Sequence, residues 1–438
     1  MSAIAKQLEK IVGAEAICAW ESLEATLQSQ ISQAIALDDP PHLLCVVFPT
    51  TQDQLAAVMA CAHTHHWRVL VCGSGSKLHW GGVTTGIQLV VSTARLDRLV
   101  EHAIGDLTVT AEAGMKLADL QAILGKAGQF LAIDSLYPQQ ATLGGVVATA
   151  DTGALRQQYG GIRDMLIGLS FVRADGKATR AGGRVVKNVA GYDLMKLMTG
   201  SYGTLGIISQ VTFRIYPVPP DSRTVVLTGD PKQIAQATAT VIASALRPAA
   251  AELIASPTTT ALNLGTGMGL IVRFQSMEVS VEKQADQLLK LGQVFGLQTL
   301  CLQQSEEADL WQRLREQIEL SPQEPIITCK IGVLPSQAVE TLEQLNQLLP
   351  SLEGAVVHAG SGLGIVRFPI VPVSLLTQLR DRCQAQGGFL TVLEAPPELK
   401  QTYDVWGYPG SGLALMKGIK QQFDPNNLLS PGRFVGGI

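Results

Sequence analysis

The chain has 438 residues, more than one compact core usually holds, so two or three folding units are expected. Hydrophobic residues make up 46% and charged residues 16% of the sequence, a balance typical of a packed globular enzyme. The formal net charge is −4 and Lys and Arg form no runs, which argues against a DNA or RNA partner.

The same composition excludes several other classes. Arg, Lys, Gly or Pro interrupts every apolar stretch before it reaches the length of a membrane-spanning helix. Seven scattered cysteines argue against a disulfide framework and for a reducing compartment. The sequence contains no CxxC and no HExxH, so neither an iron–sulfur cluster nor a metal site is expected in this chain. These features predict a cytoplasmic protein.

The first half of the chain alternates strand and helix patterns. Residues 1–39 read as an N-terminal helical segment, because charged residues mix with apolar ones. Strands are expected at 43–49, 68–75, 87–92 and 107–114, with helices at 51–67 and 116–128 between them. A Gly-rich segment from 135 to 206 leads into a strand at 207–217. The prolines of YPVPPDS then end a domain that we place at 40–220.

The second half carries an internal repeat. A strand–helix–strand–strand–helix–strand order runs from residue 224 and recurs from residue 326, with GLIVRF (269–274) and GIVRF (364–368) at matching places. Two ferredoxin-like βαββαβ units are expected, joined edge to edge in one broad antiparallel sheet. They form a cap at 221–415, with the helix at 305–319 between the repeats. Residues 416–438 are expected to return to the first domain, which gives an α+β fold overall.

Three glycine-rich elements of the first half suggest a nucleotide site. The first, CGSGSKLHWGG (72–82), follows a strand, and glycine lets backbone amides approach a phosphate closely. Leu78 stands where GxGxxG needs its third glycine, and GxxxxGK[ST] is absent, so Rossmann and Walker loops are both excluded. The others are 137–164, with Arg156 and Tyr159 as polar anchors, and 187–217. Each glycine alone could equally serve a turn or a helix cap.

Taken together and in this order, the elements resemble the FAD-binding domain of the vanillyl-alcohol-oxidase (PCMH-type) flavoproteins. Within that family the chain is most similar to the FAD-binding E component of bacterial glycolate oxidase, a glycolate dehydrogenase complex. The strings that carry the resemblance are ATLGGVVAT, KNVAGYDLMKLMTGSYGTLGIISQVTFR, VLEAPPELKQTYDVWG and FDPNNLLSPGRF. It covers residues 40–220 strongly and the C-terminal forty or so well, while the cap matches mainly in its order of elements.

The resemblance implies FAD as the cofactor and assigns its contacts. The implied pyrophosphate contacts are Gly73, Ser74, Gly75, Ser76 and Lys77, and the implied flavin and ribityl contacts are Pro138, Thr142, Gly144, Gly145 and Ala148. The residues implied to close over the cofactor are Gly203, Gly206 and Ile208, and Asn427 in the tail is a later contact. Some members attach FAD covalently through a histidine of the first loop. Here only His79 could do so, and its KLHWGG context differs from the usual GGH, so we expect noncovalent FAD.

The cap departs from the pattern of catalytic relatives. Relatives that oxidise 2-hydroxy acids carry HxGDGNxH and a later Glu-His-Gly, which hold a metal and supply a base. Here HAGSGLGI (358–365) keeps His358 but has Ser361, Leu363 and Ile365 instead, and VLEAPPE keeps Glu394 without a histidine. Too few ligands remain for a catalytic metal.

Catalytic and substrate-binding candidates are correspondingly weak. They are His358, Arg315, Lys330 and Glu394, with Arg273 and Arg367 as further side chains that could bind a carboxylate. For each basic residue the plainer interpretation is an exposed strand or helix charge, and the repeated Arg of GLIVRF and GIVRF is explained equally well by repeat symmetry.

The leading hypothesis is an FAD-bearing subunit of a glycolate-type dehydrogenase complex. Its implied partners are a small 2-hydroxy acid, a sister flavoprotein subunit with the intact histidines, and an iron–sulfur subunit, and the complex could place the chain peripherally at the inner membrane. Two alternatives stay open. One is a free-standing FAD-dependent oxidoreductase on another hydroxy acid or alcohol, and the other is a scaffold subunit in which FAD is structural.

Overall fold

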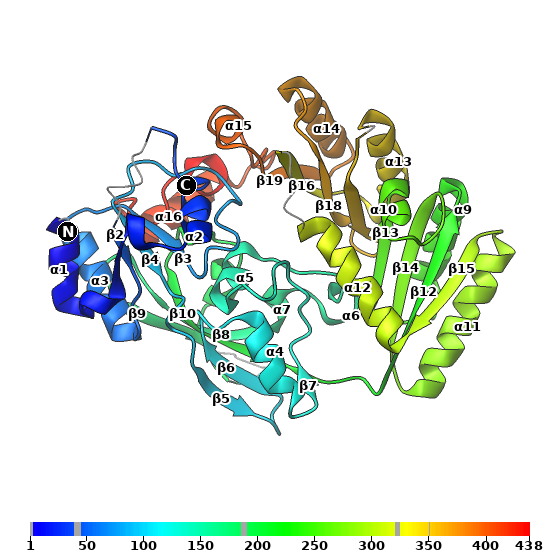
Figure 1. Ribbon diagram of the computed structural model, residues 1–438, viewed down its shortest axis with the longest axis horizontal. Helices are drawn as coiled ribbons and strands as arrows, with labels where there is room; N and C mark the ends of the chain where they lie inside the picture. Colours follow the sequence, from blue (N-terminus) through cyan, green and yellow to red (C-terminus); the bar gives the residue numbers. More distant parts are fainter. Residues whose placement is uncertain (1–2, 39–44, 185–190, 320–324, 350) are drawn as a thin grey trace. The chain divides into compact units, whose positions relative to one another are not determined.

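The computed structural model describes residues 3–38, 45–184, 191–319, 325–349 and 351–438 (Figure 1). The chain divides into two compact units. Unit 1 comprises Met1–Thr152, Gly161–Pro217 and Pro397–Ile438, and unit 2 comprises Gly153–Gly160 and Val218–Pro396. The expected boundary at residues 39 and 40 lies outside the described residues. The chain re-enters unit 1 at Pro397, before the boundary expected at 415/416, because the last strand of the unit 2 sheet ends at Glu394.

Unit 1 begins with a four-stranded sheet in the order β1-β2-β4-β3. Its strands are β1 (Ile17–Ala19), β2 (Cys45–Val47), β4 (Leu89–Ser92) and β3 (Val69–Cys72), and the last three run parallel. Alternate residues enter two separate cores. Val47, Val69 and Leu89 pack with helices α1 (Ala3–Val12) and α3 (Gln52–Thr64), while Val46 and Leu70 pack with α2 (Ala25–Ser32). Burial on both faces explains why these strands are continuously apolar.

The second sheet of unit 1 is antiparallel and has five strands in the order β5-β6-β10-β8-β9. They are β5 (Leu99–Ala103), β6 (Thr108–Glu112), β10 (Ile207–Arg214), β8 (Leu166–Val172) and β9 (Ala178–Gly182). Associated with it are α4 (Leu117–Gly125), α5 (Leu143–Thr149), α7 (Ile162–Met165), α8 (Leu194–Met198) and the short pair β7 (Gln129–Phe130) and β11 (Tyr216–Pro217). Helix α5 contacts β10, which brings the second glycine-rich element onto this sheet.

The C-terminal segment is built into unit 1. After α15 (Pro397–Thr402) and α16 (Leu413–Phe423), the tail runs beside β3, where Val69 N donates to Leu428 O at 2.7 Å and Ser430 N donates to Val69 O at 2.8 Å. The buried Lys420 Nζ donates to Asp424 Oδ2 at 2.7 Å and to the carbonyls of Thr204 and Leu429 at 2.9 Å each. A buried ammonium needs such partners, so Lys420 fixes the tail to the loop before β10.

Unit 2 is an eight-stranded antiparallel sheet in the order β15-β12-β14-β13-β17-β18-β16-β19. The first repeat supplies β12 (Asp221–Gly229), β13 (Ala250–Ile254), β14 (Met268–Ser276) and β15 (Gln298–Gln303). The second supplies β16 (Ile326–Gly332), β17 (Gly354–His358), β18 (Leu363–Pro369) and β19 (Phe389–Glu394). Both repeats have the ferredoxin-like order, and β13 pairs with β17 to join them. The expected α+β class and doubled ferredoxin-like cap are confirmed.

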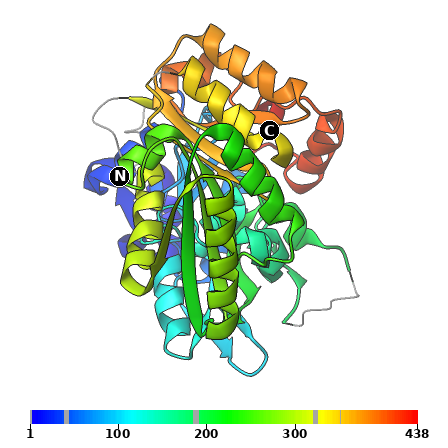
Figure 2. The ribbon, with the colours of Figure 1, turned by 90° about the vertical axis from the view of Figure 1, so that its right-hand side faces the viewer.

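The two faces of this sheet differ in character. Helices α9 (Pro231–Ala243), α11 (Glu278–Val294), α13 (Ala338–Leu348) and α14 (Val373–Ala385) cover one face (Figures 1 and 2). The other face carries α12 (Gln304–Glu319), which packs on Val226, Ile271 and Val356. Side chains two apart along a strand share a face. Register therefore places Glu252, His358, Lys330, Arg367 and Glu394 on the α12 face, which we call the polar face.

Two repeat-related arginines hold α12 on the sheet. Arg273 of β14 donates from Nε to Glu307 Oε1 at 2.8 Å near the start of the helix. Arg367 of β18 donates from Nη1 to Gln317 O at 3.1 Å and to Ile318 O at 2.7 Å near its end, where a cation also complements the helix dipole. Both arginines therefore have a structural role that accounts for their repetition, as repeat symmetry suggested.

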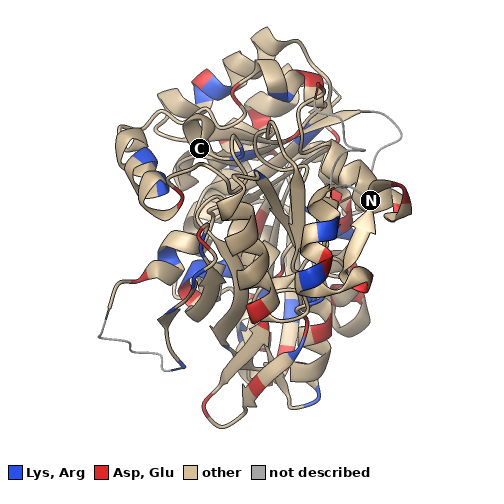
Figure 3. Ribbon diagram, turned by 90° about the vertical axis from the view of Figure 1, so that its left-hand side faces the viewer, with Lys and Arg blue, Asp and Glu red and all other residues tan. Residues whose placement is uncertain are grey.

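Two further features concern the whole described chain. No helix in the described ranges combines the length and the apolar character that crossing a membrane requires. Figure 3 shows Lys and Arg interspersed with Asp and Glu rather than gathered by sign, as the net charge of −4 suggests.

Replacing Glu307 with Ala should destabilise unit 2 strongly. Its buried carboxylate oxygen also accepts from Ser222 Oγ at 2.7 Å and Thr224 Oγ1 at 2.9 Å, so the change removes the acceptor that three donors share. We expect a loss of about 3 kcal/mol in the free energy of unfolding, measured by urea denaturation. Glu306→Ala, at an exposed position of the same helix, is the control and should cost under about 1 kcal/mol. Equal losses in the two variants would show that the hydrogen bonds and ion pair of Glu307 add no specific stability to unit 2.

Candidate functional site

Unit 1 contains a cavity where its glycine-rich elements meet. The loop after β3, the first turns of α5, the start of β10 and the C-terminal tail all contribute to its wall. Its lining residues are Val71, Cys72, Gly73, Ser74, Gly75, Ser76, Lys77, Leu78, Thr93, Thr142, Gly144, Gly145, Ala148, Thr149, Tyr202, Gly203, Gly206, Ile207, Ile208 and Arg433. Segments more than 350 residues apart in the chain thus form one wall.

The first loop presents backbone donors to this cavity. Among the described residues, none accepts a hydrogen bond from the amides of Gly73 to Ser76. A Cβ at Gly73 would collide with the Thr142 side chain, and Gly75 has a φ of +91°, which disfavours other residues. Unpaired amides in such a turn form an anion-binding concavity, as the diphosphate of a dinucleotide requires.

Helix α5 contributes glycines that allow close packing or leave room at the cavity wall, whereas its first backbone amides are already hydrogen-bonded. Thr142 caps the helix by accepting from Gly145 N at 3.3 Å, while Leu143 N and Gly144 N donate to Met115 O and Ala113 O. A Cβ at Gly144 would lie 2.9 Å from Ala113 Cβ, so this glycine is required for packing. A Cβ at Gly145 would approach only Thr142 Oγ1, at 3.1 Å, so Gly145 keeps room at the cavity wall instead.

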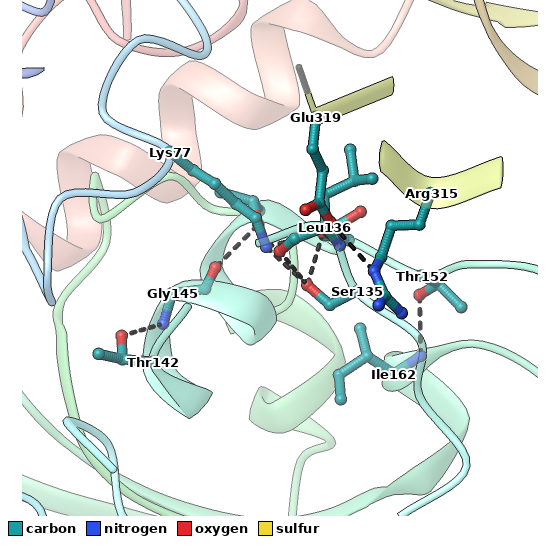
Figure 4. Close-up of polar contacts among 11 residues, drawn as sticks. Lys77, Ser135, Leu136, Thr142, Gly145, Thr152, Ile162, Arg315 and Glu319 are labelled. Atoms are coloured by element: carbon teal, nitrogen blue, oxygen red, sulfur yellow. Dashed lines mark hydrogen bonds and ion pairs between the residues drawn. The ribbon is translucent and has the colours of Figure 1, made fainter. Parts of the chain in front are cut away.

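The Lys77 side chain ties the first loop to the second element. Its buried ammonium lies 2.7 Å from Asp151 Oδ2 and 2.7 Å from Ser135 Oγ, and Ser135 Oγ donates to the same carboxylate at 2.6 Å (Figure 4). Burial alone would raise the pKa of Asp151. The Lys77 charge and the hydrogen bonds from Lys77, Ser135 and Leu136 outweigh burial and hold that pKa below its usual range. Asp151 therefore stays ionised and holds the loop in place.

Arg433 brings a buried positive charge to the cavity. Burial lowers the pKa of its guanidinium to about 10, which leaves it protonated at neutral pH, and Nη1 donates to Gly82 O at 3.0 Å. Within the described ranges no carboxylate forms an ion pair with it. A buried cation without a counter-ion favours an anionic ligand. Arg433 was not among the residues expected at the cofactor, although it lies in the string LLSPGRF that supported the resemblance.

The cavity brings together most of the residues expected at the cofactor. Those that line it are Gly73, Ser74, Gly75, Ser76, Lys77, Thr142, Gly144, Gly145, Ala148, Gly203, Gly206 and Ile208. Pro138, Arg156, Tyr159 and Asn427 are not among the lining residues. Arg156 and Tyr159 lie on α6 (Arg156–Tyr159), which groups with unit 2, and Asn427 lies in the turn after α16. The sequence did not reveal these placements because they depend on where the chain leaves and re-enters unit 1.

His79 is buried beside the cavity without lining it. Burial, followed by the nearby charges of Lys400, Arg433 and Lys77, lowers the pKa of its imidazole to about 3. Its Nε2 atom has no hydrogen-bond partner among the described residues, while its backbone carbonyl accepts from Lys400 Nζ. His79 therefore stays neutral at physiological pH.

The candidates of unit 2 lie on its polar face. Glu252 Oε1 is 2.6 Å from His358 Nδ1, Glu394 Oε2 accepts from Thr328 Oγ1 at 3.0 Å, and Arg315 lies 3.4 Å from Glu319 on α12. Lys330 lies between Ile365 and Thr391 in the sheet register. Arg315 thus has an acidic neighbour, and His358 has a carboxylate partner that the sequence did not reveal. No three His, Cys, Asp or Glu residues converge to hold a metal in the described part of the chain.

Burial of His79 should make stability depend on pH. The unfolded chain takes up a proton near pH 6.5 and the folded chain only near pH 3, so the unfolded state binds more protons between these values. The free energy of unfolding should therefore fall as pH decreases from about 6.5, by at most about 1.4 kcal/mol per pH unit. His79→Phe should reduce this slope in urea titrations at several pH values, while His65→Phe, at an exposed position, should retain it. Identical slopes in all three proteins would contradict the account.

Comparisons with known proteins agree with this arrangement. Residues 43–182 match the FAD binding domain family, and residues 219–369 and 400–434 match the C-terminal domain of FAD linked oxidases. Glycolate oxidase subunit GlcD of Bacillus subtilis is 26% identical over 423 residues, covering 89% of this chain and 88% of that protein. D-2-hydroxyglutarate dehydrogenase of Xanthomonas citri is 26% identical over 429 residues, covering 90% and 89%. Glycolate oxidase subunit GlcE of Escherichia coli is 39% identical over 152 residues, covering 34% and 43%.

Solved structures show the same fold. The structure of p-cresol methylhydroxylase superposes with a TM-score of 0.75 at 15% identity, covering 98% of this chain and 96% of that one. The matches to both domains agree with the glycine-lined cavity and its buried arginine, and FAD is the cofactor that they support. The chain belongs to the PCMH-type FAD-linked flavoproteins, with an FAD-binding domain followed by an FAD-linked oxidase C-terminal domain.

Proposed function

We propose that this chain is an FAD-bearing subunit of a glycolate-type 2-hydroxy acid dehydrogenase complex. Its relatives include glycolate oxidase subunits GlcD and GlcE, D-2-hydroxyglutarate dehydrogenase and the D-lactate dehydrogenase of Archaeoglobus fulgidus. These names support an FAD-linked oxidoreductase that acts on hydroxy acids. The proposal goes further than these names: it adds a complex, a sister flavoprotein, an iron–sulfur subunit and glycolate as the substrate.

One observation carries the subunit role. The segment at 358–365 has Ser361, Leu363 and Ile365 where the resemblance implies further metal ligands, and Ile365 is a strand residue opposite Val356. A metal at that place would polarise the substrate hydroxyl, so its loss slows the first oxidation. A sister subunit that retains the ligands would perform this step efficiently, and the flavin of this chain would accept or relay the electrons. We place the complex in the cytoplasm or peripherally at the inner membrane.

A second candidate is a free-standing FAD-dependent oxidoreductase on another hydroxy acid or alcohol. The pairing of His358 with Glu252 favours it, because an imidazole held by a carboxylate is a suitable general base. The two candidates differ in whether the isolated chain reduces its flavin at the rate of the complex.

In the proposed cofactor site the first loop holds the pyrophosphate and the second and third elements line the flavin and ribityl chain. Arg433 supplies positive charge, and Lys77 acts through Asp151 rather than directly. When bound, FAD supplies the two-electron acceptor. We propose that it is noncovalent, since His79 does not line the cavity. Pro138, Arg156, Tyr159 and Asn427 remain proposed contacts without support from the cavity.

Gly145→Val should weaken FAD binding while leaving the apoprotein stable. The added methyl groups enter the cavity wall, whereas Thr142 Oγ1 is the one atom of the described residues, apart from the helix backbone and the chain neighbours, that would lie within 4 Å of a new Cβ at position 145. FAD titration should show at least a tenfold loss of affinity, and saturating FAD should raise the melting temperature less than in the parent. Gly144→Val should destabilise the apoprotein itself, because its side chain meets Ala113. Gly125→Ala, in a helix with open space around it, is the control. Parent-like affinity in Gly145→Val would remove this residue from the cofactor site.

The isolated FAD-bound protein should bleach slowly or not at all when mixed anaerobically with glycolate or D-lactate. A well-placed base contributes about 10²–10⁴-fold to such a reaction, and a metal adds to it, so a chain without the metal ligands is slow. Co-expression with a homologous chain that carries HxGDGNxH should yield a co-purifying complex with fast flavin reduction. Rapid bleaching of the isolated chain would reject the subunit role and support the free-standing enzyme.

A further inference from the structure

The five-stranded sheet of unit 1 carries a second hollow besides the glycine-lined cavity. It is a groove of about 510 Å³ between the start of α3 and one face of the sheet, and we call it the sheet groove. Register places Gln210, Ser170 and Arg180 side by side across β10, β8 and β9, so their side chains share this face. A volume of this size lies in the range of pockets that accept small organic ligands.

A β-bulge in β10 turns an additional polar side chain into the sheet groove. The register shifts by one residue at Ser209, between Ile208 and Gln210. Ile208 therefore lines the glycine-lined cavity, while Ser209 and Gln210 both line the sheet groove. Ser209 Oγ donates to Gln52 Oε1 at 2.8 Å, which orients the Gln52 amide, and its Nε2 atom donates to no described residue. Bulges often re-aim side chains next to binding sites.

Ser170 presents a buried hydroxyl to the sheet groove. The residue is 8% exposed, and its hydroxyl forms no hydrogen bond with any residue that the structure describes. Thr110 and Thr212, on the same face of the sheet, instead satisfy each other, with their hydroxyl oxygens 3.0 Å apart. Withdrawing a hydroxyl from water without a partner costs free energy, so Ser170 calls for a partner from outside the chain.

Positive charge reaches the sheet groove from two sides. Arg180 is the cross-strand neighbour of Ser170 and is exposed, and no carboxylate in the described ranges forms an ion pair with it. Opposite the sheet, the 13-residue helix α3 begins at the groove, and the amides of Gln52 and Asp53 in its first turn donate to no described residue. The first turn of a helix carries the positive end of its dipole.

The acidic residues of the sheet groove do not cancel this charge. Glu112 is already paired, because Arg98 donates to its two oxygens from Nε at 3.1 Å and from Nη2 at 2.7 Å. The Asp53 carboxylate is exposed, so water and salt screen it. Hydrogen-bond donors therefore exceed free acceptors inside the groove.

We propose that the sheet groove binds a small organic oxyanion. Its carboxylate or phosphate group would be held by the Arg180 guanidinium, the Ser170 hydroxyl and the first amides of α3, a donor set that suits an anion with several acceptor oxygens. The rest of the groove gives room for the organic part of the ligand. This inference goes beyond the proposed function and does not depend on it, since none of these residues lines the glycine-lined cavity.

The alternative is that these residues only fasten α3 to the sheet. That account explains the hydrogen bond between Ser209 and Gln52. It assigns no task to the Ser170 hydroxyl or to the Arg180 charge, and it predicts no binding of an anion. Binding measurements therefore separate the two accounts.

The test is calorimetric titration of the full-length FAD-bound protein with inorganic phosphate and with acetate at constant ionic strength. Arg180→Gln should weaken anion binding at least about tenfold and Ser170→Ala at least about threefold, because each removes a donor to a charged group. The control is Lys177→Gln, which removes an exposed positive charge from the turn between the same two strands without touching the groove and should keep the parent's affinity.

Tighter binding of phosphate or of acetate would identify which of the two groups the ligand carries. Absence of saturable binding of either anion up to about 10 mM would overturn the proposal. It would equally be overturned by parent-like affinity in both Arg180→Gln and Ser170→Ala, or by an equal loss in Lys177→Gln, which would indicate unspecific surface charge.

Hydrogen exchange provides a second readout that locates the anion. Phosphate should slow amide exchange at Gln52 and Asp53 in the parent and much less in Arg180→Gln, because the bound anion accepts from these amides. The first turn of α11, a helix start in unit 2, should exchange at the same rate with and without phosphate. Unchanged exchange at the start of α3 under saturating phosphate would overturn the proposal.

Discussion

The ion pair between Lys77 and Asp151 is the constraint on which the glycine-lined cavity of unit 1 depends. The first loop leaves β3 with unpaired amides, and such a loop has no intrinsic reason to keep one conformation. Lys77 at its end reaches a carboxylate that is itself held by Ser135 and the Leu136 amide. Buried charges of this kind tolerate few alternative partners, so the pair fixes the loop against the second glycine-rich element.

In unit 2, charged side chains likewise hold one segment of the chain against another. Its repeats could each fold as a ferredoxin-like layer, and two equivalent arginines secure helix α12 across the polar face at opposite ends. The repeated Arg of GLIVRF and GIVRF therefore has a common task with different acceptors, a carboxylate in one repeat and helix carbonyls in the other. Gene duplication followed by divergence would produce this pattern.

Much of the fold was predictable because it is encoded locally. The doubled element order, the shared GLIVRF and GIVRF strings and the glycine spacing of the first half all lie within short windows of sequence. The cavity was predictable in part, since the glycines of 72–82 indicate a close backbone approach, while the individual contacts were implied by the resemblance. Arg433 and Glu252 were missed because their roles arise from contacts across 351 and 106 residues, and periodicity carries no information on such pairing. The chain returns to unit 1 at Pro397, before the expected boundary at 415/416, although the adjacent prolines 396 and 397 mark this place in the sequence.

The interleaving of the two units has a consequence for synthesis. Unit 1 supplies both the beginning of the chain and residues 397–438, and unit 2 is translated between them. During translation unit 2 can complete its sheet while unit 1 still lacks α16, the strand-like segment beside β3 and Arg433. A chain that stopped after the cap would lack Arg433 and the segment beside β3, so part of the cavity wall would be missing while unit 2 was already folded.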